Sequence, residues 1–232
     1  DYNLAQLLRD LEAVEGLNRL RISSIGASQL TDEVMNVIKS SNKIVRHLHI
    51  PIQSGSDTVL KRMRRKYTME FFEKRILELK EMMPNIAITS DVIVGFPGET
   101  EEEFMETYDF IKKHHFSELH VFPYSIRTGT PAARMTDQID DDTKNERVNR
   151  LINLSDELAT AYAERFRDDV LEVIPEETKD GKLIGHSDNY LKVAIDGDES
   201  LVGEIIKVKV TQPGYPVSAG EVVKVLEKPM VK

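Results

Sequence analysis

The sequence predicts an α/β protein in which a partial parallel (β/α) barrel is followed by a small antiparallel β-barrel. Helical and strand periodicities alternate from residue 1 to about residue 140, which is typical of parallel βα units. From about residue 168 the pattern changes to short β-rich runs that are separated by Asp-Gly and Pro-Gly turns. We therefore expect a partial barrel over 1–140, a connecting helix over 141–167 and a second barrel over 168–232.

Each element of the first part follows from its local pattern. An opening helix is predicted because leucines recur at helical spacing, at Leu4, Leu7, Leu8 and Leu11. The elements expected after it are, in order, a strand at 20–25, a helix after Thr31, a β-rich segment at 46–52, helices at 56–64 and 68–82, a strand at 86–94, a helix from 100 to about 115 and a strand at 119–122. Thr100 and Glu103 predict a capping box. The strand at 86–94 is so apolar that we expect cover on both of its faces.

The βα series starts on a helix, whereas the first helix of such a series normally follows a strand. We therefore expect that upstream strands are missing from this chain. The barrel-like sheet is then partial and has one uncovered edge. A family of open sheets that begins with a helix is the alternative.

Turn and capping patterns predict the second part of the chain. A polar segment at 123–140 leads into a capping box from Thr143 to Glu146, which predicts the start of the connecting helix. Five β-rich runs then indicate an antiparallel barrel of the OB-like kind, at 170–173, 182–185, 191–195, 204–210 and 221–225.

The composition excludes several classes of function. The 232 residues contain no cysteine, so a disulfide framework, a thiolate zinc site and an iron–sulfur cluster on its usual thiolates are impossible within them. No apolar run approaches the roughly 20 residues of a membrane span, and we expect a cytoplasmic protein with no membrane partner. The formal net charge of −9 means that any contact with RNA must come from local basic patches.

Functional side chains of a parallel sheet are expected at the carboxyl ends of its strands. Gln53 and Ser54 offer an amide and a hydroxyl suited to ribose hydroxyls or to a carboxylate, although solvation of Gln53 is an equal alternative. The turn at 95–98 (GFPG) lets the backbone approach a flat ligand, with the N–H and C=O near Val94 pairing to a base edge. An ordinary βα turn explains these glycines as well.

Basic residues gather at 61–66 (KRMRRK), where five of six residues are cationic. Such a run displaces counterions from a phosphate backbone, or else it is only a solvated face. Arg127 lies in a loop after the last strand of the first part, where a guanidinium suits a phosphate or carboxylate. A surface arginine without a ligand is the alternative there.

The histidines offer a weaker signal. His47 and His49 alternate along a strand and could point to one side as metal ligands. Since no carboxylate lies near them in the sequence, ordinary strand histidines are favoured, and we expect no metal site. We expect His114 and His115 to face solvent near a helix end. No nucleophile–base pair or phosphate loop is recognisable, so the residues alone predict no reaction.

Four segments resemble the radical-SAM methylthiotransferases, and their order and spacing match across 20–135. They are 49–56 (HIPIQSGS), 63–68 (MRRKYT), 90–100 (SDVIVGFPGET) and 122–133 (FPYSIRTGTPAA). The terminal β-rich part looks like the TRAM domain that ends these enzymes. The segment 117–125 looks most like the branch that acts on N6-threonylcarbamoyladenosine in tRNA. The isopentenyladenosine branch and the ribosomal-protein branch are the alternatives.

The resemblance implies a transferase that adds a methylthio group to C2 of the modified adenine. It implies S-adenosylmethionine and two [4Fe–4S] clusters as cofactors, tRNA as partner, and separate donors of sulfur and electrons. The family binds its clusters through cysteines, which this chain lacks. We therefore expect a fragment that is inactive alone and carries no catalytic residue of its own. A non-enzymatic RNA-binding adaptor that reuses the fold is the alternative.

The resemblance also assigns residues by position. It places six residues at the S-adenosylmethionine site, namely Ser24, Gln53, Ser54, Asp91, Val94 and Phe122. The basic run and the loop arginine supply our candidates for tRNA contacts, namely Arg62, Arg64, Arg65, Lys66 and Arg127.

Overall fold

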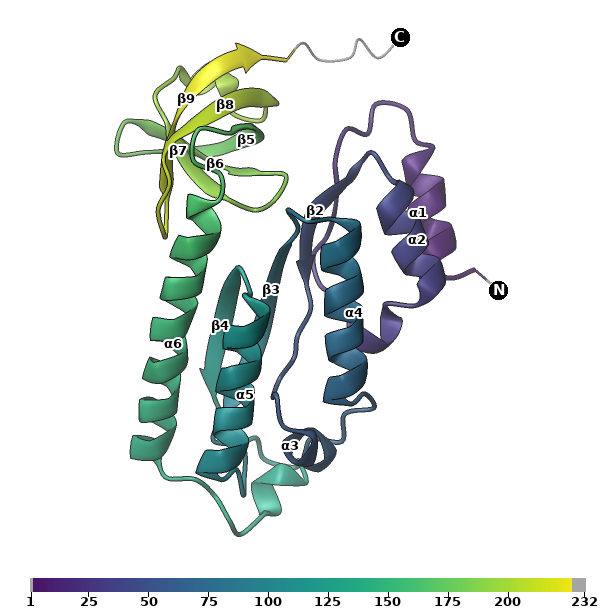
Figure 1. The fold of residues 1–232 in the computed structure, drawn as a ribbon, viewed down its shortest axis with the longest axis vertical. Helices are drawn as coiled ribbons and strands as arrows, with labels where there is room; N and C mark the ends of the chain where they lie inside the picture. The colour runs from purple at the N-terminus through teal and green to yellow at the C-terminus, as the bar shows by residue number, and fades with distance from the viewer. Residues whose placement is uncertain (1, 227–232) are drawn as a thin grey trace.

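The computed structural model describes residues 2–226, which form a helix-covered parallel sheet and a separate small barrel (Figure 1). The sheet has the order β1-β2-β3-β4, and each strand runs parallel to the next. Its strands are β1 (Leu20–Ile22), β2 (Ile44–His49), β3 (Ala87–Val94) and β4 (Glu118–Pro123). Its helices are α1 (Leu4–Glu12), α2 (Asp32–Ser40), α3 (Asp57–Arg62), α4 (Met69–Met82) and α5 (Glu101–His114). The predicted α/β class with a parallel sheet is confirmed.

The sheet is open. Among the described residues, β1 and β4 each pair with a single neighbouring strand, so the four strands do not close on one another. The helices α4 and α5 lie in front of the sheet in Figure 1, and the long helix α6 (Asp141–Glu164) runs beside β4 toward the barrel. No helix in the described part of the chain combines the length and apolarity needed to cross a membrane.

The core lies between the sheet and its helices. Side chains from β3, such as Ile88 and Val92, pack there with Phe72 of α4 and Phe104 of α5, all of them almost fully buried. The expectation that both faces of β3 are covered is wrong for part of the strand. Asp91 lies on the opposite face and remains partly exposed, because the open sheet places no further layer over it.

Local capping decides where the helices begin. The predicted capping box is present, because Thr100 Oγ1 accepts the Glu103 N–H at 3.2 Å and Glu103 Oε2 accepts the Thr100 N–H at 3.0 Å. The capping box predicted at Thr143 is wrong. The Asp140 carboxylate accepts the Thr143 N–H at 2.8 Å and also its hydroxyl, so α6 begins at Asp141 and Thr143 lies in its first turn.

The second part is a closed barrel with the order β5-β6-β7-β9-β8. Its strands are β5 (Val170–Lys179), β6 (Lys182–Ser187), β7 (Lys192–Ile195), β8 (Ile206–Gln212) and β9 (Ser218–Val225). The prediction that all pairs are antiparallel is wrong at one pair, since β7 and β9 run parallel. Strand direction cannot alternate all the way round a ring with an odd number of strands, so a closed five-stranded barrel needs such a pair.

The helix α6 belongs to both cores. Leu151 and Leu154 pack into the core of the sheet, whereas Tyr162, Ala163 and Phe166 join the core of the barrel. The Tyr162 hydroxyl donates to the Asn189 carbonyl oxygen at 2.9 Å. These contacts attach the barrel to the end of the sheet where the strands begin (Figure 1).

Candidate cofactor and RNA sites

A cavity of about 480 Å³ lies where β3 and β4 end. Its lining includes Gln53, Asp91, Ile93, Phe122, Tyr124 and Arg127. Three of these residues, Gln53, Asp91 and Phe122, are predicted cofactor contacts, and Arg127 is a predicted RNA contact. The fold therefore brings together residues that lie more than 70 positions apart in the sequence.

Backbone hydrogen bonds hold Gln53 against β3. Its N–H donates to the Asp91 carbonyl oxygen at 2.9 Å, and its own carbonyl oxygen accepts the Ile93 N–H at 2.9 Å. Gln53 has a φ of 63°, a left-handed conformation that is uncommon for a residue other than glycine. Such strained positions cluster at binding sites, where the surrounding structure holds them in place.

Tyr124 lines the cavity and carries a buried hydroxyl without a partner. Its ring packs edge-on against Phe96, with centroids 5.2 Å apart, and its hydroxyl is buried with no hydrogen-bond partner in the part of the chain that the structure describes. Leaving a buried hydroxyl unpaired costs about 1–3 kcal/mol.

The other three predicted cofactor residues do not line this cavity. Ser54 is fully buried, and its hydroxyl lies 3.3 Å from Thr107 Oγ1. The Val94 carbonyl oxygen accepts the Tyr124 N–H at 2.8 Å, so the sheet already uses the carbonyl that was expected to pair with a base. Ser24 is exposed after β1. The glycine of the same motif is needed for packing, since a Cβ on Gly55 would approach the Thr107 Cα to 2.6 Å.

A buried ion pair supports the glycine turn at 95–98. Glu99 Oε2 accepts the Gly95 N–H at 2.6 Å and also accepts from Arg147 of α6 at 2.8 Å. Burial raises the pKa of Glu99, while the Gly95 N–H and the Arg147 guanidinium oppose that rise. Gly95 itself has a φ of 69°, which favours glycine. The sequence gives no sign of this partner except that Arg147 lies on the buried face of its helix.

Of the four RNA contacts predicted in the basic run, one is a structural residue and three are exposed. Arg62 donates to Glu103 Oε2 at 2.6 Å and to Oε1 at 3.0 Å, so it ties α3 to the start of α5. Arg64, Arg65 and Lys66 are exposed, and in residues 2–226 none of them forms an ion pair. These three residues are called the exposed basic run below.

Residues 1–111 match the family model of the radical SAM superfamily. Over 98% of its length the chain is 63% identical to the Bacillus subtilis protein named threonylcarbamoyladenosine tRNA methylthiotransferase MtaB. Residues 1–111 belong to the radical SAM superfamily. A tRNA-2-methylthio-N(6)-dimethylallyladenosine synthase of Thermoanaerobacter pseudethanolicus is 39% identical over 97% of the chain. The chain spans about half the length of these curated relatives, 52% of the first and 49% of the second.

A solved structure supports the same fold. Coproporphyrinogen III oxidase from Escherichia coli, a radical SAM enzyme, superposes on 90% of this chain and 51% of its own chain with a TM-score of 0.54. The two sequences are 16% identical, so this likeness concerns the fold alone. The comparisons confirm the family that the sequence motifs indicate.

The cavity fits one of the cofactors of a radical SAM protein and not the other. An aromatic face at Phe122, an amide at Gln53 and a carboxylate at Asp91 are groups that suit the adenine, the ribose and the cationic amino group of S-adenosylmethionine. The volume lies in the usual range for small-ligand pockets. An iron–sulfur cluster does not fit this chain, because a sequence without cysteine offers no thiolate ligand.

The pairing of Arg62 with Glu103 predicts a dependence of stability on pH. The hydrogen bond from Arg62 lowers the pKa of Glu103 to about 2 from its ordinary value of 4.5. The stabilisation is therefore complete above the ordinary pKa and is lost as the pH falls from 4.5 toward 2. We expect Glu103→Gln to lower the free energy of unfolding by about 1–2 kcal/mol at pH 7 and by progressively less below pH 4.5.

Urea unfolding followed by circular dichroism at neutral and acidic pH measures this difference. Glu106→Gln is the control, because Glu106 is an exposed carboxylate of the same helix. If Glu103→Gln lowers the free energy of unfolding by the same amount at pH 7 and at pH 3, the assigned pairing is contradicted.

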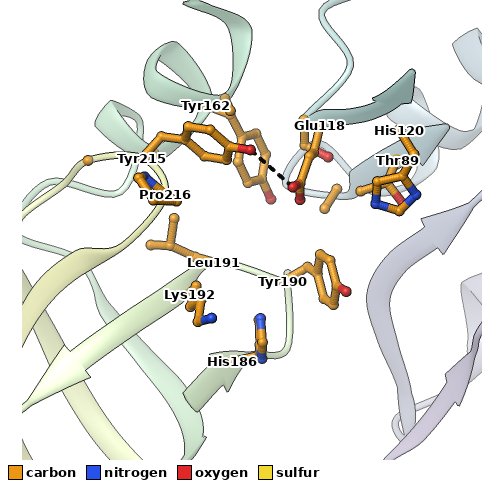
Figure 2. Close-up of a pocket in the computed structure, with 15 residues that line it drawn as sticks. Thr89, Glu118, His120, Tyr162, His186, Tyr190, Leu191, Lys192, Tyr215 and Pro216 are labelled. Atoms are coloured by element: carbon orange, nitrogen blue, oxygen red, sulfur yellow. Dashed lines mark hydrogen bonds between the residues drawn. The ribbon is translucent and has the colours of Figure 1, made fainter. Parts of the chain in front are cut away.

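A second cavity of about 320 Å³ lies between the sheet and the barrel (Figure 2). Tyr190, with a φ of 67°, stacks against both His47 and His186, with centroids 3.9 and 4.9 Å away. Tyr215 donates to Glu118 Oε1 at 3.2 Å across the contact between the two parts, as the dashed line in Figure 2 shows. This cavity did not follow from any sequence motif, because its walls come from both parts of the chain.

The histidine predictions are only partly correct. His114 does not face solvent, because its side chain is buried and its Nε2 lies 2.8 Å from Glu73 Oε1. His115 is exposed and ends α5 in a left-handed conformation. His47 is buried, and burial lowers its pKa to about 3. His49 is only partly exposed and lies beside Asp91.

Proposed function

We propose that this chain is part of a radical SAM tRNA methylthiotransferase whose whole form modifies C2 of N6-threonylcarbamoyladenosine in tRNA. The observation that carries this proposal is the 63% identity, over 98% of the chain, to the Bacillus subtilis protein of that name. Support for the dimethylallyladenosine substrate is weaker, since the relative named for it is 39% identical. We place the enzyme in the cytoplasm, with its tRNA.

The cavity at the ends of β3 and β4 is assigned to S-adenosylmethionine. This cofactor, when bound, supplies the radical and methyl chemistry of the class. Phe122 is about half exposed and offers a ring face to the adenine, while Gln53 offers its amide to ribose hydroxyls. The Asp91 carboxylate suits the cationic amino group. We assign Ser54 and Val94 to the support of this rim, with Ser24 near its far side.

The two [4Fe–4S] clusters proposed for the whole enzyme need ligands from outside this chain. The donors of sulfur and electrons are likewise separate partners. This chain alone is therefore proposed to bind and position the cofactor and the tRNA, without carrying out the reaction. Its own residues exclude water from the cofactor and hold it at the edge of the sheet.

The tRNA is proposed to contact two basic features. Arg127 lies in the lining of the cofactor cavity, where a guanidinium can hold a phosphate of the RNA. The exposed basic run lies after α3, at the same carboxyl end of the sheet. The closed five-stranded barrel, proposed to be a TRAM domain, provides a third contact that recognises the shape of the RNA.

The exposed basic run gives a test of RNA binding. Changing Arg64, Arg65 and Lys66 together to alanine removes three cations, so we expect the slope of log K against log salt to become shallower by about 2–3. The measurement is tRNA binding by fluorescence anisotropy at several salt concentrations. The control changes Lys39 and Lys74, exposed lysines of α2 and α4, to alanine. An unchanged slope in the triple variant would remove this run from the RNA-binding surface.

The substrate is tested with the whole gene. A bacterial strain without tRNA methylthiotransferases should gain the methylthio derivative of N6-threonylcarbamoyladenosine when it expresses the complete protein, as measured by nucleoside mass spectrometry. Gln53→Ala and Phe122→Ala should lower the yield at least about 10-fold. Val223→Ala, a change at an exposed barrel residue, is the control. Methylthiolation of isopentenyladenosine instead, or of no nucleoside, would overturn the proposed function.

A further inference from the structure

We propose that His49, Asp91 and His120 form a binding site for a zinc-like divalent cation on the open face of the parallel sheet. One ligand atom from each of these residues lies within 4.8 Å of the other two. His49 ends β2, Asp91 lies in β3, and His120 lies opposite Asp91 in the register of β4. Three adjacent strands therefore set the spacing of the ligands, with no loop involved.

The distances suit a tetrahedral metal ion. His49 Nε2 lies 3.3 Å from Asp91 Oδ1, and His120 Nδ1 lies 3.1 Å from the same oxygen. Ligands that each lie about 2.0 Å from a tetrahedral Zn²⁺ are separated from one another by about 3.3 Å. Both histidine nitrogens thus lie at the spacing of zinc ligands from the carboxylate oxygen, and the two nitrogens lie within 4.8 Å of each other.

A chain of hydrogen bonds behind the site orients His49. Arg21 can only donate, so its contact of 3.0 Å makes His47 Nδ1 an acceptor and places the proton of the neutral His47 ring on Nε2. That proton is donated to Thr89 Oγ1, which lies 3.0 Å away. The same hydroxyl oxygen lies 3.0 Å from His49 Nδ1 and has a second lone pair to accept from it.

This arrangement is the outer shell that metal-binding histidines normally have. A histidine ligand usually donates its other ring N–H to an oxygen, which fixes both the tautomer and the ring orientation. With a metal ion on Nε2, the His49 proton would lie on Nδ1, where Thr89 Oγ1 can accept it. Stacking of the His49 and His120 rings, with centroids 5.4 Å apart, restricts their movement further.

The site leaves room for an outside ligand. The side chain of His120 is 48% exposed and that of Asp91 is 31% exposed. Asp91 lines the cavity assigned to the cofactor, whereas His120 lines the second cavity (Figure 2). Three protein ligands and one open position are the arrangement of a catalytic zinc site, whose fourth ligand is water or a substrate oxygen or nitrogen.

The chemistry of the donors limits the choice of ion. Two imidazole nitrogens and one carboxylate favour Zn²⁺, Co²⁺ or Ni²⁺, whereas Mg²⁺ and Ca²⁺ prefer oxygen ligands. The test concerns the affinity of this chain for a metal ion in the absence of cofactor, since Asp91 is also assigned to the amino group of the cofactor. The sequence did not reveal the site, because the carboxylate lies 42 positions beyond His49. Only the pairing of β3 with its neighbours brings the two residues together.

Titration of the metal-free chain with Co²⁺, followed by its visible absorption, tests the site, and Zn²⁺ is then added as competitor. We expect intense bands typical of tetrahedral or five-coordinate Co²⁺ that saturate at one ion per chain and disappear when Zn²⁺ is added. Asp91→Asn and His120→Ala should weaken Co²⁺ binding by more than about 100-fold, and Thr89→Val by about 10–100-fold. His115→Ala and His186→Ala are the histidine controls and should bind as the unmodified chain does.

His120 is half exposed, so its variant keeps the test valid even if Asp91→Asn does not fold. Absence of the bands, or equal Co²⁺ affinity in His120→Ala and the unmodified chain, would overturn the proposal. Failure of the nucleoside assay would leave the Co²⁺ result unchanged, so the two proposals fail separately.

Discussion

Arg147→Ala is expected to lower the free energy of unfolding by about 3–5 kcal/mol, because it leaves a buried carboxylate without its cation. The side chains of Arg147 and Glu99 are only 5% and 1% exposed, so water cannot replace the lost partner. The Gly95 N–H alone would then face the carboxylate, and the glycine turn at 95–98 would loosen. Urea unfolding at pH 7, followed by circular dichroism, measures the loss.

The dependence of this loss on pH identifies its cause. Burial already raises the pKa of Glu99, and removing Arg147 should raise that pKa further. Protonation then relieves the unpaired charge, so the loss should shrink as the pH falls below neutrality. Arg150→Ala is the control, since Arg150 is more exposed and its ion pairs should contribute less than about 1 kcal/mol. A loss that grows toward acidic pH would contradict this account.

Phe166→Ala is expected to lower the free energy of unfolding by about 3–5 kcal/mol, the usual range for removing a buried aromatic ring. Phe166 follows α6, is 2% exposed and packs edge-on against Tyr162, with centroids 5.1 Å apart. It shares the barrel core with strand residues such as Val193 and Ile206. Removing its ring leaves a cavity at the point where the helix meets the barrel.

Thermal and urea unfolding of Phe166→Ala measure this effect. Val223→Ala is the control, because Val223 of β9 is 58% exposed and its change should stay within about 0.5 kcal/mol. In this variant we also expect the barrel to unfold before the sheet, in a separate transition, because α6 packs on both. A loss below about 1 kcal/mol would mean that the ring does not stabilise the barrel.

Local patterns predicted the elements better than their ends. Thr100 and Glu103 predict the start of α5 correctly, because both capping partners lie within one helical turn. The same pattern at Thr143 was misleading, since the Asp140 carboxylate accepts both the N–H and the hydroxyl of Thr143. The parallel pair in the barrel could not be predicted from local patterns. It follows only once the five strands are known to close into a ring.

The candidate sites were predictable only as separate residues. Gln53, Asp91 and Phe122 were expected because they end strands of a parallel sheet, and the structure gathers them in one cavity. Arg62 was expected to contact RNA, yet it pairs with Glu103, whose position across α3 and α5 no local pattern reveals. His49 lacked a carboxylate in the sequence and has one in space.

The sequence by itself determined the α/β class, the capping box at Thr100, the family and the absence of thiolate ligands, because these depend on neighbouring residues and on residue types. Only the tertiary structure decided that Glu99 meets Arg147 and that Asp91 lies between two histidines. The physical reason is that such contacts depend on strand register and helix packing. Both are set by the burial of many side chains together, so they cannot be predicted from any short segment of the chain.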